Sequence, residues 1–187
     1  MIRAINRALQ GIEEVTGLLA ALVMFLIMII AAADVGMRYL FNSPFSWAYD
    51  LIALYLMTGL FYFALSGTFA HHAHVSVDIL QHYMTPLQRR LSEIVVCALS
   101  LLLFAGIAYA GAGRALDSYI EDDVLAGLIP WPTWPSIALV PFGAGLLTLR
   151  LGLHLVAHLG TLITGTETIE LTPVSGSPEA MEREMVE

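Results

Sequence analysis

The sequence predicts an all-α integral membrane protein with four transmembrane helices and short interfacial helices, and three observations support this fold class. Four stretches lack Asp, Glu, Lys and Arg, namely Val15–Ala33, Leu51–Ala70, Ile94–Gly113 and Val124–Leu149. A helix rises about 1.5 Å per residue, so about 20 apolar residues match a hydrocarbon core of about 30 Å. The chain is 58% hydrophobic and only 13% charged, against about 25% charge in soluble domains. Its mean hydropathy is +0.76.

Composition also excludes several classes of function. The four spans leave only short loops and one tail of the 187 residues, so the chain has no room for a soluble catalytic domain and we expect no enzymatic activity. The chain contains no Lys and no basic stripe, which argues against nucleic-acid binding. The single cysteine, Cys97, falls in the third stretch. We interpret it as a small packing residue. Because the chain has only this cysteine, an intramolecular disulfide is excluded.

The first element is expected to be an amphipathic interfacial helix over residues 1–14, with a frayed terminus as the alternative. Its apolar residues recur at spacings of three and four at Ile2, Ile5, Leu9 and Ile12. The first span follows at about 15–37. Its apolar run exceeds the about 7–15 residues of a signal peptide, and Glu13 and Glu14 precede it. We therefore expect this span to be retained.

The first span ends in a pair of opposite charges. Asp34 and Arg38 are four residues apart on one helix face, where they can form an ion pair. Such a pair near the membrane edge is interpreted as a structural clasp, with a contact to a partner subunit as the alternative.

The second span is predicted at about 46–70. Ser43 followed by Pro44 has the pattern of a helix N-cap with proline at the first helical position. Trp47 then lies at interface depth, as aromatic-belt residues do. Asp50 lies near the helix N-terminus, where the helix dipole favours a negative charge.

The third span is predicted at about 91–114. Thr85-Pro86-Leu87-Gln88 fits a capping box that starts its helix, and Arg89 and Arg90 follow in the interface. Gly106 and Ala110 form a pair of small residues that permits close helix packing.

The fourth span is predicted at about 135–158, after a rigid turn. Three prolines that cannot continue a helix enclose Trp131 and Trp134, which we place at the interface. Pro141 should kink the span, and Gly143 and Gly145 permit another helix to approach. The membrane domain is thus 15–163. Residues 164–187 contain six Glu and one Arg, and their composition predicts a disordered acidic cytoplasmic tail.

The arginines predict the orientation. If the N-terminus is cytoplasmic, six basic residues lie inside and two lie outside, which the positive-inside rule favours. The inner set is Arg3, Arg7, Arg89, Arg90, Arg150 and Arg183, and the outer set is Arg38 and Arg114. Both termini are then cytoplasmic.

Histidines close two of the spans and raise the question of a metal or haem. They are His71, His72 and His74 after the second span, and His154 and His158 near the end of the fourth. Two helices that offer histidine at one depth meet the requirement for bis-histidine haem ligation. A haem-binding membrane anchor of a redox complex is therefore one alternative, although imidazole also tolerates a membrane edge without any ligand.

Motifs in the first half of the chain resemble those of a known family. They are Asp34-Val-Gly-Met-Arg38-Tyr39, Asn42-Ser-Pro44, Trp47-Ala-Tyr-Asp50 and His74-Val75-Ser-Val77-Asp78, followed by Ile129-Pro130, Trp134 and Val140-Pro141-Phe-Gly143. Their order and spacing over about 35–145 are similar to the small membrane subunit of TRAP (tripartite ATP-independent periplasmic) transporters. One departure is Asp50, where the family usually has Glu, and another is the pair of histidines that crowds His74.

The resemblance implies a scaffold subunit in the inner membrane of a bacterial cell. In that family a large polytopic membrane subunit holds the substrate and sodium sites, and a periplasmic protein captures the substrate, typically an organic acid. The small subunit then needs no cofactor or metal of its own. An orphan tetraspan scaffold for another complex remains a further alternative.

Two groups of residues are the candidate sites. We expect Asp34, Arg38, Asp50 and Arg114, with Trp47, Trp131 and Trp134, to organise the outer rim, and His74, Asp78, Arg89 and Arg90 to organise the inner rim. A third group could dock the periplasmic protein, with a solvated loop as the alternative: Asp117, Glu121, Asp122 and Asp123.

Overall fold

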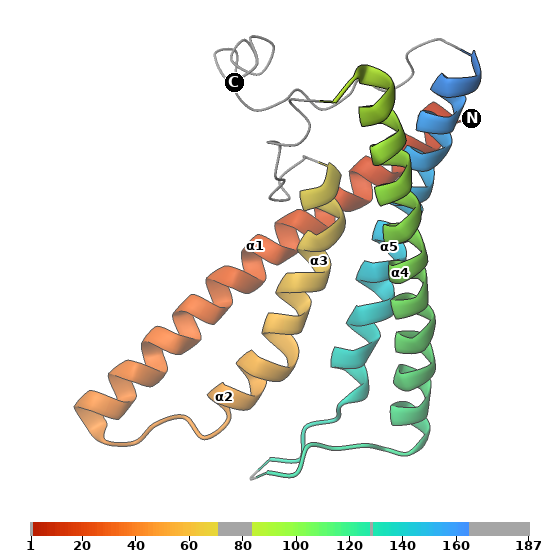
Figure 1. Cartoon of the computed structure of the whole chain (residues 1–187). Helices are drawn as coiled ribbons and strands as arrows, with labels where there is room; N and C mark the ends of the chain where they lie inside the picture. The colour runs from red at the N-terminus through yellow and green to blue at the C-terminus, as the bar shows by residue number, and fades with distance from the viewer. Residues whose placement is uncertain (1, 71–83, 128, 165–187) are drawn as a thin grey trace, which may run out of the picture.

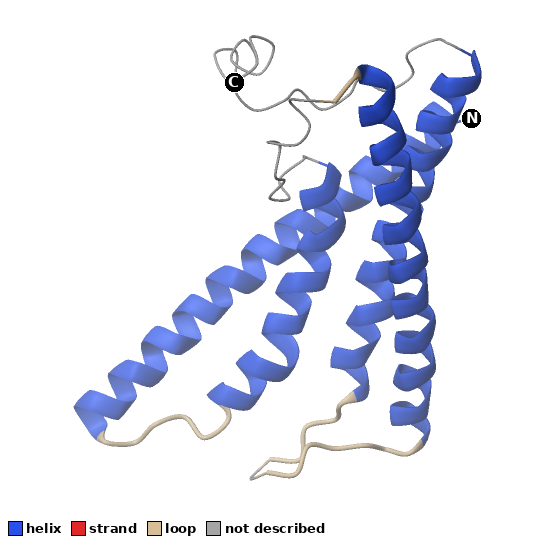
Figure 2. Ribbon diagram, in the orientation of Figure 1, coloured by secondary structure: helices blue, strands red, loops and turns tan. Residues whose placement is uncertain are grey.

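The computed structural model describes residues 2–70, 84–127 and 129–164. These residues form helices and connecting loops, with no strand among them (Figure 2). The elements are α1 (Ile2–Phe41), α2 (Ala48–Asp50), the π-helical segment η1 (Leu51–Leu56), α3 (Met57–Ala70), α4 (Pro86–Ile120) and α5 (Trp134–Thr164). The all-α class is confirmed.

In the described part of the chain, four helices are long and apolar enough to cross a membrane, as predicted. They are Ile5–Phe41, Ala48–Ala70, Leu87–Ile120 and Trp134–Leu162. The second of these joins α2, η1 and α3 into one continuous helical unit. The first continues without a break through residue 14, so the predicted interfacial helix and the first span share one helix. The interfacial position of residues 1–14 stays a prediction, and 165–187 lie outside the described residues.

The bundle of helices has a loop end and a terminal end. The loop end carries residues 42–47 and 121–133, and the terminal end carries the start of α1 and the end of α5 (Figure 1). Helices α4 and α5 lie side by side along their length, whereas α1 crosses at an angle and diverges toward the loop end (Figure 1). The terminal end is therefore where α1 meets the other helices.

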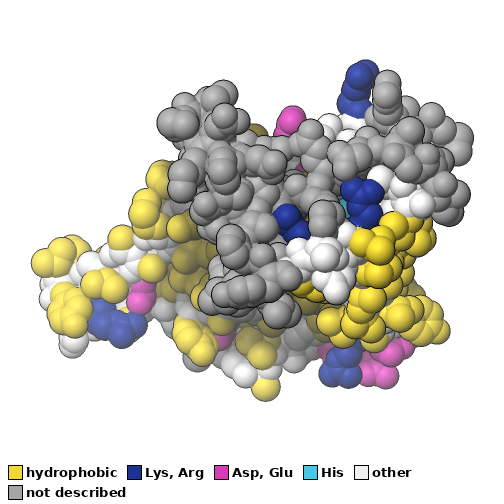
Figure 3. All heavy atoms as spheres, turned by 45° about the horizontal axis from the view of Figure 1, so that its top comes forward, with side chains coloured by type: hydrophobic (Ala, Val, Ile, Leu, Met, Phe, Trp, Pro, Cys, Tyr) yellow, Lys and Arg dark blue, Asp and Glu magenta, His cyan; other side chains and the backbone are white. Residues whose placement is uncertain are grey.

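A small core lies between α3, α4 and α5. Its buried side chains are Leu65, Cys97, Leu147 and Leu151, with Tyr62, Phe69, Leu101, Phe104 and Leu155 packed around them. Cys97 is 3% exposed, which agrees with its interpretation as a packing residue. Hydrophobic side chains otherwise cover much of the visible helix surface, and charged side chains occur in small groups (Figure 3). Such an apolar exterior suits a lipid solvent.

Glycines set the closest helix contacts. A Cβ atom at Gly143 would lie 2.7 Å from Tyr62 Cβ and 2.9 Å from the Tyr62 carbonyl carbon, so α5 and α3 meet there as predicted. At Gly145 nothing lies within 4 Å. In α4, Gly111 contacts Val140, whereas Gly106 is exposed with nothing within 4 Å. The predicted close packing at Gly106 is therefore absent from the described residues, because the opposite face of α4 meets α5.

The helix starts follow the predicted signals in one case and differ in another. At α4, Thr85 and Gln88 form the predicted capping box. At the second span, the prediction of Ser43 as N-cap is wrong, because the helix begins at Ala48 with Trp47 as an N-cap that makes no side-chain hydrogen bond. Residues 43–45 instead belong to a loop without regular secondary structure.

Candidate functional sites at the two ends of the helices

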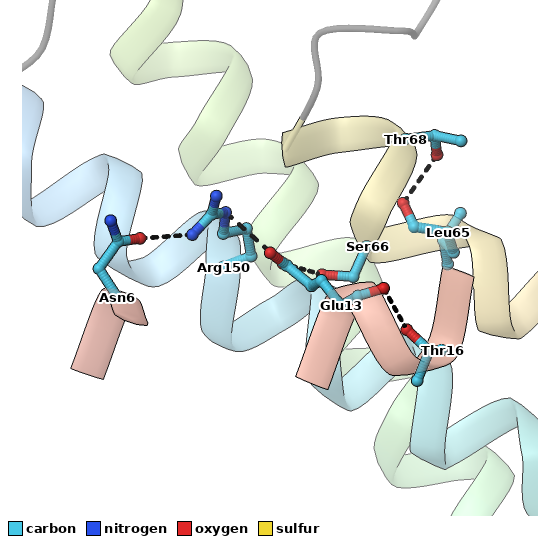
Figure 4. Close-up of polar contacts among 7 residues, drawn as sticks. All are labelled: Asn6, Glu13, Thr16, Leu65, Ser66, Thr68 and Arg150. Carbon is cyan, nitrogen blue, oxygen red and sulfur yellow. Dashed lines mark hydrogen bonds and ion pairs between the residues drawn. The ribbon is translucent and has the colours of Figure 1, made fainter. Parts of the chain in front are cut away.

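The terminal end contains a polar cluster made of the buried residues Glu13, Ser66 and Arg150 and the half-buried Asn6 (Figure 4). Asn6 and Glu13 come from α1, Ser66 from α3 and Arg150 from α5. Asn6 and Glu13 are seven residues apart, close to two helical turns, so their side chains share one face of α1. The cluster therefore connects three helices that are distant in sequence.

Glu13 is at the centre of this cluster. Its Oε1 atom accepts a hydrogen bond from the Ser66 hydroxyl at 2.6 Å and lies 3.5 Å from Arg150 Nε. Arg150 Nη1 donates to Asn6 Oδ1 at 2.5 Å. The Arg150 and Glu13 side chains are only 6% and 4% exposed. The pair is thus withdrawn from solvent and lipid alike, and each charge depends on the other for compensation.

Sequence reasoning did not pair these two residues. Glu13 was noted only as a charge before the first span, and Arg150 was counted among the cytoplasmic arginines. Both are buried between helices. A signal for this pairing was present in the sequence, because Glu13 lies two residues before the start of one charge-free stretch and Arg150 directly follows another. In antiparallel spans these positions reach similar depth.

At the loop end, Asp34 organises the connection that follows α1. Its Oδ2 atom accepts a hydrogen bond from Arg38 Nη2 at 2.9 Å, which is the predicted ion pair. Its Oδ1 atom accepts from the Phe45 backbone N–H at 2.7 Å. Asn42 adopts a positive φ of 51°, which asparagine tolerates better than most residues. Ser43 was expected to accept a backbone hydrogen bond at the start of the second span. The structure instead has Asp34 accept a backbone hydrogen bond from the loop before that span.

The connection between α4 and α5 is held by paired backbone. Leu125 N–H donates to the Trp131 carbonyl at 2.8 Å, and Thr133 N–H donates to the Asp123 carbonyl at 3.0 Å. The Tyr55 hydroxyl, from η1, donates to the Pro132 carbonyl. This hairpin, residues 123–133, is therefore fixed to the second span as well as to its own helices.

Aromatic side chains pack in pairs at the loop end. The Trp131 ring meets Tyr55 edge-on at 5.7 Å, and Trp134 meets Tyr119 at 5.4 Å. Trp47 stacks on Phe45 at 5.3 Å. These contacts gather aromatic rings at one end of the helices, as expected of residues that prefer a membrane interface.

The other predicted residues of this end are less closely connected. Asp50 lies near the hairpin, since a Cβ atom at Gly127 would be 3.8 Å from Asp50 Oδ2. Arg114 is exposed on α4, and among the described residues the ion-pair partner of Asp34 is Arg38. The four acidic residues proposed for docking are all exposed: Asp117, Glu121, Asp122 and Asp123. They are accessible to a partner.

At the terminal end, only part of the predicted inner rim can be placed. Arg89 and Arg90 are half-buried on the first turns of α4. His74 and Asp78 lie outside the described residues, as do His71 and His72. The predicted rim therefore stays a prediction in this region.

The described histidines lie within the helix packing. His154 meets the Phe69 ring edge-on at 5.2 Å, and His158, 5% exposed, lies 6.4 Å from His154 between ring centroids. Within residues 2–70, 84–127 and 129–164, no group of three or more His, Cys, Asp or Glu side chains is arranged to hold a metal ion. His154 and His158 thus pack against other side chains in the described part of the chain.

A comparison with protein families gives one match. The model of the DctQ component of tripartite ATP-independent periplasmic transporters matches residues 27–161, which is more than two thirds of the chain. A comparison with curated proteins finds no significant match. The matched range begins within α1 and includes Asp34, Ser66 and Arg150, but it excludes Asn6 and Glu13.

Proposed function

The chain belongs to the DctQ family of tripartite ATP-independent periplasmic transporter components, and we propose that it is the small, non-catalytic scaffold subunit of such a transporter. It is a multi-pass membrane protein with four candidate spans. The observation that carries the proposal is the family match across all four of these helices. The transporter role is thus a property of the assembly rather than of this chain alone.

The distribution of polar groups supports a scaffold role. A transport site requires polar groups and interrupted helices near the bilayer midplane. In the described part of the chain, the buried charged side chains are Glu13 and Arg150, and they neutralise each other. The substrate and sodium sites are therefore assigned to the large membrane subunit, which would carry out sodium-coupled uptake of an organic acid.

The proposal includes an orientation and a location. The loop end faces the periplasm of a bacterial inner membrane, and the terminal end faces the cytoplasm, in agreement with the excess of arginine at the terminal end. The exposed acidic residues near the hairpin then face the periplasmic substrate-binding protein. Docking of that protein at Glu121, Asp122 and Asp123 is the finer part of this proposal.

Co-purification tests the assembly. A tag at the C-terminus, gentle solubilisation of the native membrane and mass spectrometry should recover a large polytopic membrane protein at near one-to-one yield. A tagged, unrelated four-span protein from the same membrane serves as the control. Recovery of the chain alone, or with a protein that shows a haem Soret band, would contradict the proposal.

Charge reversal tests the docking surface. The variant Glu121→Lys/Asp122→Lys/Asp123→Lys should reduce substrate uptake, because it removes a negative surface without touching a buried contact. The control is charge reversal at Glu14, which is also exposed but lies in α1 toward the terminal end, away from the proposed docking loop. Unchanged uptake with normal complex yield would eliminate docking at this loop and leave the scaffold role intact.

A further inference from the structure

Helix α1 buries side chains fully only in its first half. Its buried residues are Leu9, Glu13, Thr16 and Ala20, and none of its residues after Ala20 is buried. Beyond that point the helix diverges from α3 (Figure 1). The deeply buried contacts of α1 are thus concentrated near the terminal end, where they can set the angle at which α1 crosses the bundle.

Apolar packing gives those contacts little directional preference. Among the buried residues of α1, only Leu9 has a large apolar side chain. In a bilayer, moreover, an apolar side chain gains little by leaving lipid for another helix, because lipid tails are as apolar as leucine. The Thr16 hydroxyl bonds within α1, to the Glu13 carbonyl at 3.1 Å. Packing alone thus leaves several crossing angles close in energy.

The polar cluster provides the missing preference. A charged side chain in the hydrocarbon region is costly unless it is paired. Glu13 can contact Ser66 on α3 and Arg150 on α5 at the same time only when α1 has this rotation and tilt. Asn6 contacts Arg150 two turns earlier on the same face. Two contacts along α1 fix a direction, whereas one contact would act as a pivot.

We propose that the Glu13–Arg150 pair, with Asn6 and Ser66, is a positioning device that sets the crossing angle of α1 against α3 and α5. The pair then determines where the less deeply packed second half of α1 lies in the membrane. Asn6 and Glu13 lie outside the range that matches the family, so this inference goes beyond the proposed scaffold role. It concerns the isolated chain and holds whether or not the transporter partners are as proposed.

The test measures the position of α1 by electron–electron double resonance between spin labels in lipid nanodiscs. In a Cys97→Ser background, one label pair joins Val35 of α1 to Leu102 of α4. Both side chains are exposed, at 51% and 70%. A control pair joins Leu102 to Val156 of α5, which is 55% exposed. The first pair reports the divergent half of α1, and the control pair reports the α4–α5 unit.

The deciding variant is Glu13→Met/Arg150→Met, which removes both charges and leaves flexible apolar side chains that fill irregular space. Because no charge remains unpaired, this variant is expected to fold. The Val35–Leu102 distribution should lose its single narrow peak, while the Leu102–Val156 distribution stays narrow. A narrow, unshifted Val35–Leu102 peak in the variant would overturn the proposal, because packing alone would then position α1. Broadening of both distributions would also overturn it, because the pair would then hold the whole bundle rather than α1.

Discussion

The contact between Gly143 of α5 and Tyr62 of α3 yields a prediction with an internal control. A Cβ atom at Gly143 would lie 2.7 Å from Tyr62 Cβ and 2.9 Å from its carbonyl carbon, well inside the about 3.5–4.0 Å of a favourable contact. The obstructing atoms belong to the backbone and to a Cβ, so no rotamer change can relieve the clash. The variant Gly143→Ala must separate α3 from α5 or bend one of them.

Gly145 is the matched control, since it lies on the same helix with nothing within 4 Å of its would-be Cβ. Both alanine variants gain the same preference of alanine over glycine in a helix, about 0.5–1 kcal/mol. Their difference therefore isolates the overpacking cost, about 1–3 kcal/mol, with Gly143→Ala the less stable. Unfolding in mixed micelles with increasing SDS, followed by circular dichroism, gives both stabilities. Equal stabilities would refute the close approach at Gly143.

Two further predictions use the same unfolding assay. Glu13→Gln should lower the free energy of unfolding by about 3–5 kcal/mol, because it leaves the buried Arg150 guanidinium without a counter-charge; a loss no larger than that of an exposed Glu14→Gln control would contradict the buried pair. Tyr55→Phe should cost about 0.5–1.5 kcal/mol through loss of its hydrogen bond to the hairpin. Tyr109→Phe, at an 86% exposed position, should change nothing, and equal effects of the two tyrosine variants would argue against the hairpin contact.

The four spans could be predicted because the bilayer imposes a length and a composition on each helix separately. Two local contacts were also predictable, because in each the partners lie within four residues of one another. They are the capping box at Thr85 and Gln88 and the Asp34–Arg38 ion pair. Local chemistry was sufficient for such features. The close approach at Gly143 was predictable in type, because glycine leaves room, although the partner Tyr62 was not.

The features that sequence reasoning missed depend on partners far along the chain. Ser43 was expected to cap the second span, but Asp34, eleven residues before Phe45, takes the backbone N–H of the connection instead. Glu13 and Arg150 are separated by most of the chain, and the sequence analysis did not pair them. A single helical pattern cannot reveal which of two neighbouring charges will find a counter-charge on another helix.

Two of the three carboxylates of α1 show how one bilayer leads to two different solutions. Glu13 and Asp34 are 21 residues apart, which at about 1.5 Å per residue spans about 31 Å, the thickness of the hydrocarbon core. A carboxylate at that edge must either reach polar surroundings or find a buried counter-charge. Asp34 stays at the surface connection, bound to Arg38 and to the Phe45 backbone. Glu13 instead contacts Ser66 and Arg150 on other helices.

The first arrangement, around Asp34, involves only α1 and the loop that follows it, so it can move with α1. The second joins α1 to other helices, and for that reason the Glu13 end fixes the angle of α1 while the Asp34 end follows it.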